Sequence, residues 1–220
     1  MATSNITELV FIIDKSGSMA GLESDTIGGI NATLTENRKV KGECNVSLLQ
    51  FNQDCEVTLD RVPIEKVKPL TNQDYRVGGC TALLDAVGGA IKYHHKVQTI
   101  LPDGFRADHL IFVIITDGLE NASTRFDYPQ VKQLIEDKTR EGWEFIFLGA
   151  NIDVASEAAR LGIDHNRASA YVADSVGSGI AYEAVSRACV QSRVHGALSS
   201  NWKAKAEADA KKRGFFRRNH

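Results

Sequence analysis

The chain has 220 residues, with 26 Lys and Arg against 28 Asp and Glu and a hydrophobic fraction of 43%. This composition is that of an ordinary globular protein. It excludes a largely disordered chain, because there is enough apolar surface to offset the conformational entropy lost on folding. The longest apolar runs, such as residues 9–13, are far shorter than the roughly 20 residues that span a bilayer, so no membrane span is expected.

The N-terminal residues and the cysteines indicate the cellular compartment in which the protein is expected. The first ten residues hold no basic stretch and no apolar core, so no secretion signal is expected there and the predicted location is the cytoplasm. The four cysteines are then expected to be reduced thiols; they are Cys44, Cys55, Cys80 and Cys189. No two of them have Cys-x-x-Cys spacing, which argues against a cysteine metal site.

Apolar patterning predicts alternating strands and helices. In chain order, strands are expected at residues 9–13, 46–51, 56–59, 110–115, 145–148 and 169–172, and helices at 22–38, 83–95, 129–141, 154–161 and 179–194. The runs 9–13 and 110–115 are apolar without alternation, as in central strands covered on both faces. Polar turn formers at residues 52–54 predict an antiparallel hairpin between the second and third strands.

This order of elements indicates an α/β fold. We expect a doubly wound, Rossmann-like open sheet that is mainly parallel, with helices on both faces and right-handed crossovers. The chain shows no internal repeat, so residues 1–198 are interpreted as one domain.

The last residues differ in charge from the rest. From Lys203 onward there are seven basic residues and two acidic ones, and apolar periodicity stops near residue 198. We therefore expect residues 199–220 to be a basic, flexible tail, although the Ala- and Lys-rich stretch could form a helix. Such a tail could attract nucleic acid, an anionic membrane or an acidic protein.

Oxygen-bearing side chains follow the ends of distant strands. Asp14, Ser16 and Ser18 come directly after the first strand, Asp117 follows the strand at 110–115, and Thr81 lies in a Gly-Gly-Cys-Thr loop before a helix. Ligands of open α/β sheets bind beyond the carboxyl ends of the strands. Because these donors are all oxygens, they favour a hard cation such as Mg²⁺. The same residue types also cap helices and close turns, which is the alternative interpretation of each one alone.

Together these motifs resemble the von Willebrand factor type A (VWA) domain and its metal-ion-dependent adhesion site, MIDAS, in the family's order over about 190 residues. The resemblance implies that Ser16, Ser18 and Thr81 bind Mg²⁺ (with Mn²⁺ or Ca²⁺ as substitutes), while Asp14 and Asp117 act largely through water. It further implies a protein partner that offers an Asp or Glu carboxylate, an ATPase or larger assembly among the candidates. It also implies an antiparallel edge strand at residues 56–59. Lys15, inside the first motif, is expected to point outward.

Two other classes of function remain open. Two aspartates and a metal ion could support a metal-dependent phosphohydrolase. However, the sequence has no phosphate-binding P-loop, no dinucleotide-binding loop, no nucleophile elbow and no nucleophile paired with a general base. We therefore predict a protein-interaction module that is not an enzyme. The third class is a nucleic-acid-associated factor recruited by its basic tail.

Overall fold

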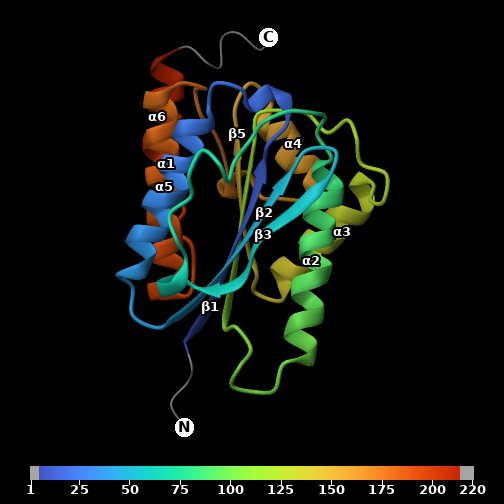
Figure 1. The fold of residues 1–220 in the computed structure, drawn as a ribbon, viewed down its shortest axis with the longest axis vertical. Coiled ribbons are helices and arrows are strands. Elements are labelled where there is room, and N and C mark those ends of the chain that lie inside the picture. Colours follow the sequence, from blue (N-terminus) through green and yellow to red (C-terminus); the bar gives the residue numbers. More distant parts are fainter. Residues whose placement is uncertain (1–4, 214–220) are drawn as a thin grey trace.

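The computed structural model of the chain describes residues 5–213, and its elements alternate as predicted (Figure 1). The strands are β1 (Ile6–Asp14), β2 (Glu43–Phe51), β3 (Cys55–Pro63), β4 (His109–Thr116), β5 (Glu144–Gly149) and β6 (Ala168–Ala170). The helices are α1 (Glu23–Arg38), α2 (Leu83–Ile100), α3 (Tyr128–Arg140), α4 (Val154–Leu161), α5 (Ser175–His195) and α6 (Ala204–Lys212).

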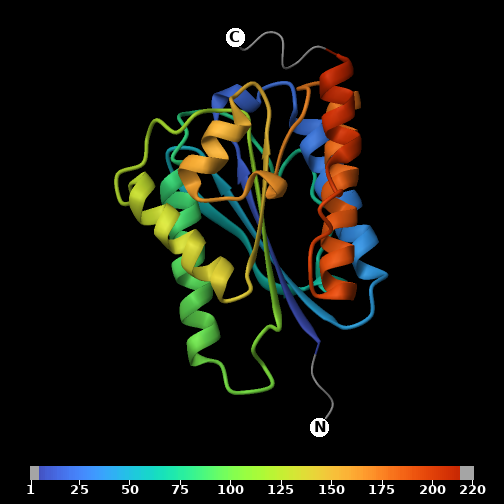
Figure 2. The ribbon, with the colours of Figure 1, turned by 180° about the vertical axis from the view of Figure 1, so that it is seen from behind.

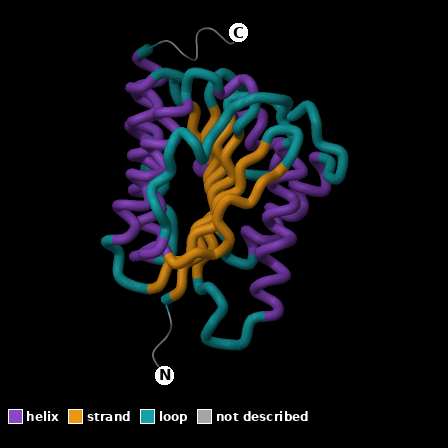
Figure 3. The backbone as a smooth tube through the Cα atoms, viewed as in Figure 1, coloured by secondary structure: helices purple, strands orange, loops and turns teal. Residues whose placement is uncertain are grey.

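The strands form one six-stranded sheet in the order β3-β2-β1-β4-β5-β6. Every neighbouring pair is parallel except β2 with β3, which is antiparallel and lies at the edge. The expected α/β fold with one antiparallel edge strand is therefore confirmed. The tube view shows the sheet as the middle layer between two groups of helices (Figure 3).

Each face of the sheet has its own hydrophobic core. On one face, side chains such as Leu9 and Phe11 pack with residues of α1 and α5. On the other, Val10 and Ile12 pack with residues of α2, α3 and α4. Figure 2 shows these two helical layers on opposite sides of the strands. Because neighbouring residues of β1 serve opposite cores, residues 9–13 of this central strand all have to be apolar, as the sequence indicates.

Three helices begin at aspartate caps. Asp127, Asp153 and Asp174 each accept a hydrogen bond from a backbone N–H in the first turn of α3, α4 and α5. The cap at Asp174 explains why α5 begins at Ser175, before the start predicted from apolar periodicity. Among the helices of residues 5–213, none combines the length and the apolar character that crossing a bilayer requires.

Strand β3 extends beyond the predicted 56–59 and is irregular. Its pairing with β2 shifts register around Leu48, and Arg61 adopts a positive φ of 49° at this point. The Arg61 guanidinium donates a hydrogen bond to the carboxylate of Glu8 on β1. The Glu8 side chain is buried. A bulge of this kind redirects a side chain, and here it supplies the cation that a buried carboxylate needs.

The stretch from Trp202 to Arg213 packs against the domain, and this corrects the expectation that these residues belong to a flexible tail. The side chains of Trp202, Ala206 and Ala210 are buried. The Lys203 ammonium donates hydrogen bonds to two backbone carbonyls, one of them that of Ala168 at 2.9 Å. Although α6 is rich in basic residues, it has a small apolar face that packs against α5 and β6. The prediction from charge did not take this face into account. Residues 214–220 of the predicted tail lie outside the described residues, and the division at residue 198 stays a prediction.

Candidate metal centre

The predicted donors come together at the carboxyl edge of the sheet. Parallel pairing of β1 with β4 sets Ile13 beside Ile115, so the last residues of the two strands, Asp14 and Thr116, lie side by side. Asp117 is the next residue after β4, and Thr81 lies two residues before α2. All of these side chains except that of Ser18 are buried.

A single point near Gly118 shows how closely these groups converge. A methyl group placed on Gly118 would lie 2.9 Å from Oγ of Ser18, 3.0 Å from Oγ1 of Thr81 and 3.6 Å from Oδ2 of Asp14. Asp14 and Ser18 come from the loop after β1, Thr81 comes from the loop before α2, and Gly118 itself follows β4, so three loops meet at one small space. Any side chain at position 118 would enter that space, so glycine is required there for lack of room.

The Asp14 carboxylate is held in place by hydrogen bonds. Its Oδ1 accepts from the backbone N–H of Ser16 at 2.6 Å, and its Oδ2 accepts from the Thr116 hydroxyl at 2.6 Å. The hydroxyls of Ser16 and Ser18 lie 3.0 Å apart. The sequence analysis did not assign a role to Thr116. Its position directly before Asp117 was the one feature of the sequence that could have indicated a role at the site. Asp14 therefore orients the first loop and keeps the serine hydroxyls on one side.

Asp117 differs from Asp14 in having no partner. Both of its carboxylate oxygens are buried, and neither makes a hydrogen bond with any residue in the range 5–213. Burial raises the pKa of Asp117 and the nearby Asp14 carboxylate raises it further. The Ser18 hydroxyl and the Asn151 side chain oppose the rise; both are near the carboxylate but outside hydrogen-bond geometry. Burial likewise raises the pKa of Asp14. Two desolvated carboxylates side by side are costly unless a cation compensates them.

The loops that carry the donors are joined to one another by backbone hydrogen bonds. Gly17 donates to the carbonyl of Gly79 at 3.0 Å, and Gly78 donates to the carbonyl of Lys15 at 2.8 Å. Gly79 has a φ of 85°, a conformation that favours glycine, and this explains the Gly-Gly pair before Thr81. The glycine-rich loop is therefore fixed against the first loop.

Thr81 is also fixed from the side of β4. Its backbone N–H donates to Oδ1 of Asn121 at 2.8 Å. The Glu120 carboxylate accepts from the backbone N–H of Leu84 at 2.9 Å, in the first turn of α2. Neither residue was assigned a site role from sequence. These contacts make the position of Thr81 depend on the loop that carries Asp117.

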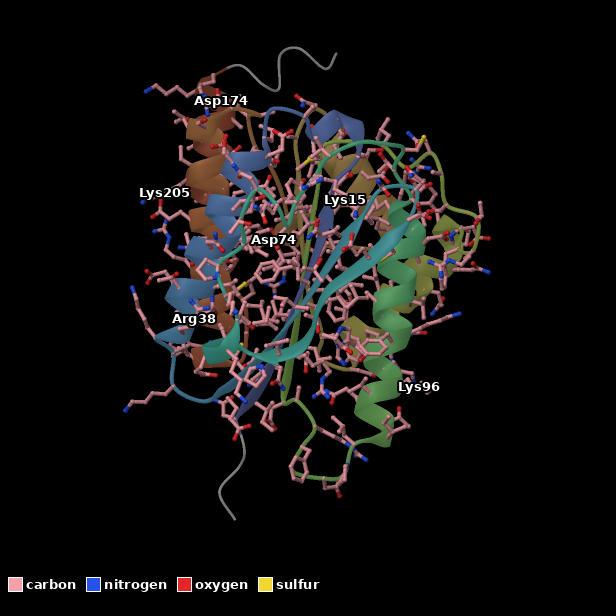
Figure 4. The ribbon with its side chains drawn as sticks, viewed as in Figure 1. Lys15, Arg38, Asp74, Lys96, Asp174 and Lys205 are labelled. Carbon is pink, nitrogen blue, oxygen red and sulfur yellow. The ribbon has the colours of Figure 1, made fainter. Side chains whose placement is uncertain are left out.

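Lys15 lies outside the group of donors. Its ammonium pairs with the Glu56 carboxylate on β3 at 2.7 Å, which agrees with the expectation that it points outward (Figure 4). Cys80, which directly precedes Thr81 in the glycine-rich loop, is exposed. The donor set therefore consists of hydroxyls and two carboxylates.

This chemistry fits a hard divalent cation. Within residues 5–213 there is no cluster of three or more His, Cys, Asp or Glu side chains arranged to hold a metal ion. Only two carboxylates meet at the candidate centre, and neutral hydroxyls make up the remaining protein donors. Zinc and copper sites usually draw on His and Cys, whereas Mg²⁺ accepts such oxygen donors together with water. A bound cation would explain why the two buried oxygens of Asp117 have no hydrogen-bond partner among the described residues.

Comparison with solved structures places the fold among VWA-type domains. The crystal structure of proximal thread matrix protein 1 from the mussel byssus matches with a TM-score of 0.57 at 14% identity, over 86% of this chain and 46% of that one. A form of that protein is described as having a zinc-occupied MIDAS motif. The VWF domain of the type V pili tip protein Mfa5 from Porphyromonas gingivalis matches with a TM-score of 0.61 at 10% identity, over 90% of this chain and 99% of that one.

These similarities extend to the fold alone. This chain spans less than half the length of the byssus protein. No protein-family model and no curated protein matches the sequence. The shared fold agrees with the family resemblance indicated by the motifs, while the ligand role of each residue stays a prediction.

Proposed function

We propose that this chain is a protein-interaction module whose binding depends on a divalent cation, Mg²⁺ in the first instance. The cation would be held by the hydroxyls of Ser16, Ser18 and Thr81, with Asp14 and Asp117 acting largely through water. The observation that carries the proposal is the pair of buried, unpartnered oxygens of Asp117, which lies next to the small space bounded by Ser18, Thr81 and Asp14.

The charge balance supports an open ligand position. Two carboxylates compensate a divalent ion formally, and neutral hydroxyls leave it more electrophilic than further carboxylates would. An Asp or Glu carboxylate of a partner protein is the ligand that such an ion accepts most readily in place of water. The exposed side of the centre, where Ser18 lies, is the route by which a partner would approach.

The first test is metal binding without a partner. Metal-free protein is titrated with Mg²⁺, Mn²⁺, Ca²⁺ and Zn²⁺ while heat of binding and thermal unfolding are recorded. We expect Mg²⁺ and Mn²⁺ to raise the unfolding temperature at millimolar concentration, because a ligand that binds only the native state stabilises it. Ser18→Ala and Thr81→Ala should weaken this response. Ser175→Ala, an exposed serine at the start of α5, is the matched control.

The second test concerns the partner. Proteins captured from a native extract are compared in Mg²⁺ and in EDTA, with Thr81→Ala as a parallel bait. Capture that ignores both the chelator and the substitution would contradict the role of the centre in recognition. Phosphatase assays of the metal-loaded protein, and salt-dependent nucleic-acid binding with and without residues 214–220, address the two alternative functions.

A further inference from the structure

A cavity lies between the β2–β3 hairpin and α2, on the opposite face of the sheet from α1 and α5. It has a volume of about 630 Å³, and none of the five candidate metal-site residues lines it. Its apolar lining comes from both sides, from Leu49, Val57, Ala86, Gly89, Ala90 and Tyr93. The other lining residues are mostly polar or charged, so the cavity combines an apolar wall with polar groups, and its volume is in the range of small-molecule sites.

The cavity exists because α2 presents small residues where the hairpin passes over it. A methyl group placed on Gly89 would have no atom within 4 Å, although Gly89 lies in the middle of the helix. A glycine at such a position destabilises a helix by about 1 kcal/mol relative to alanine. Val57 and Tyr93 flank the opening and stay 56% and 43% exposed. The space above Gly89 is therefore open, bordered by apolar side chains and accessible from solvent.

The charged groups around the cavity are mainly acidic. Three carboxylates line it, those of Asp54, Asp60 and Asp85, against one guanidinium, that of Arg125. Asp85 accepts hydrogen bonds from three consecutive backbone N–H groups, and Nε of Arg125 lies 3.4 Å from its carboxylate. The charge of Arg125 is thus largely balanced by Asp85. Asp54 and Asp60, both exposed, leave the rim negative.

The other polar groups of the cavity are suited to a hydrogen-bond donor. The Tyr93 hydroxyl donates to the Asp60 carboxylate at 2.7 Å, which fixes both side chains at the rim. His94 lines the cavity and is 1% exposed, and its Nε2 has no hydrogen-bond partner among the described residues. Desolvation lowers the pKa of His94 to about 4, so the imidazole is neutral near pH 7. A neutral imidazole can accept a proton donor without charge repulsion.

We propose that this cavity is a binding site for a small organic cation, with a primary ammonium group on an aromatic or aliphatic body. The apolar body lies over Gly89 and Ala90 and against Val57. The ammonium group lies toward the carboxylates of Asp54 and Asp60, next to the ring of Tyr93. A cation gains from this rim by charge pairing and by contact with an aromatic face, whereas an anion of the same shape is repelled.

The test uses phenethylamine and tryptamine as probes, with 2-phenylethanol as the neutral analogue and 3-phenylpropionate as the anionic one. Binding is followed by backbone amide chemical shifts, which report where each probe lies. We expect the amines to shift the amides of Gly89, Ala90 and Tyr93 and to bind at least about tenfold more tightly than 3-phenylpropionate. The same shifts should appear in EDTA, because the cavity is separate from the metal centre.

Gly89→Leu supplies the decisive variant, because its side chain enters free space and the helix gains propensity. It should weaken amine binding by at least about tenfold while leaving the protein folded. Gly28→Leu is the matched control: Gly28 is a helical glycine of α1, on the other face, and a methyl group there also meets no atom within 4 Å. Asp60→Asn should weaken the amines and not the alcohol. Amine binding that survives Gly89→Leu, equal binding of 3-phenylpropionate, or no amine shifts at millimolar concentration would each overturn the proposal.

Discussion

The hydroxyl of Thr116 donates a 2.6 Å hydrogen bond to Oδ2 of Asp14 and so joins the carboxyl ends of β4 and β1, 102 residues apart in the chain. Asp14 is therefore part of the fold at this edge as well as a candidate for the metal centre. Asp117, by contrast, has no hydrogen-bond partner within residues 5–213. The two aspartates of the candidate centre should for this reason respond differently to substitution.

We expect Asp117→Asn to abolish the Mg²⁺-dependent rise in unfolding temperature without lowering the stability of the metal-free protein. The substitution removes a buried charge that has no partner, and in EDTA that charge opposes folding. The measurement is thermal unfolding in EDTA and in millimolar Mg²⁺. A full Mg²⁺ response in this variant would remove Asp117 from the proposed centre.

Asp14→Ala should abolish the same metal response but also destabilise the metal-free protein, by roughly 1–3 kcal/mol. It leaves the buried N–H of Ser16 without an acceptor and the Thr116 hydroxyl with only the Gly118 carbonyl. Urea unfolding in EDTA measures this loss, and unfolding should remain cooperative. If Asp14→Ala were as stable as the native chain, the hydrogen bonds at this edge would not have the structural role described.

The motifs could be predicted from the sequence because each is local: a strand end followed by polar residues, or a glycine-rich loop before a helix. The residues that hold the motifs could not, because their roles depend on contacts between distant segments. Thr116, Asn121 and Glu120 stand beside Asp117 in the sequence, but nothing there shows that they reach Asp14, Thr81 and the start of α2. The donors were predictable and their support was not.

For the fold, too, the local elements could be predicted from the sequence and the long-range contacts could not. The order and type of the elements followed from apolar periodicity, and α4 was placed at its observed bounds. The register shift in β3 and the docking of α6 were missed. In β3 the irregularity places Arg61 against Glu8, a buried partner that lies 53 residues away. In α6 the many basic residues led to the prediction of a flexible tail, although Ala206 and Ala210 form a buried face.

The docking of the C-terminal helix leads to a stability prediction. Trp202 is buried and its indole N–H donates to the carbonyl of Asn166 at 2.8 Å. Trp202→Ala should therefore destabilise the chain by roughly 3 kcal/mol, through lost burial and an unsatisfied carbonyl. Lys205→Ala is the control from the same segment. Lys205 projects outward from α6 (Figure 4), and its one ion pair among the described residues is a 3.9 Å contact with Glu183. Equal unfolding midpoints for both variants would show that this segment does not contribute to stability.

The burial of His94 predicts a loss of stability in mild acid. Desolvation lowers the pKa of His94 from 6.5 to about 4, so between these values the unfolded chain binds a proton that the folded chain does not. Stability attributable to His94 is therefore complete above the unfolded pKa and falls as the pH drops toward the folded one. Between about pH 7 and about pH 5 the loss should be roughly 2 kcal/mol.

The comparison that isolates this effect is native protein against His94→Gln, by urea unfolding at both pH values. Glutamine does not titrate, so the free energy of unfolding should depend less on pH in the variant by the stated amount. Glu8 contributes a pH dependence of opposite sign, because burial raises its pKa, but that contribution is common to both proteins and cancels. Identical pH dependence of native protein and variant would show that His94 is accessible to protons in the folded state.

Alanine substitutions at two adjacent glycines of α1, Gly28 and Gly29, are expected to change the stability of the protein in opposite directions. A methyl group on Gly29 would lie 2.1 Å from Cγ of Tyr182 in α5, whereas one on Gly28 would meet no atom within 4 Å. Tyr182 is buried, so its ring has no room to move aside. Gly29→Ala should therefore destabilise the protein by roughly 1–3 kcal/mol. Gly28→Ala should instead stabilise it by up to about 1 kcal/mol through helix propensity. Urea unfolding of both variants measures the difference, and a stabilised Gly29→Ala would mean that α1 and α5 are not held at the close approach that Gly29 permits.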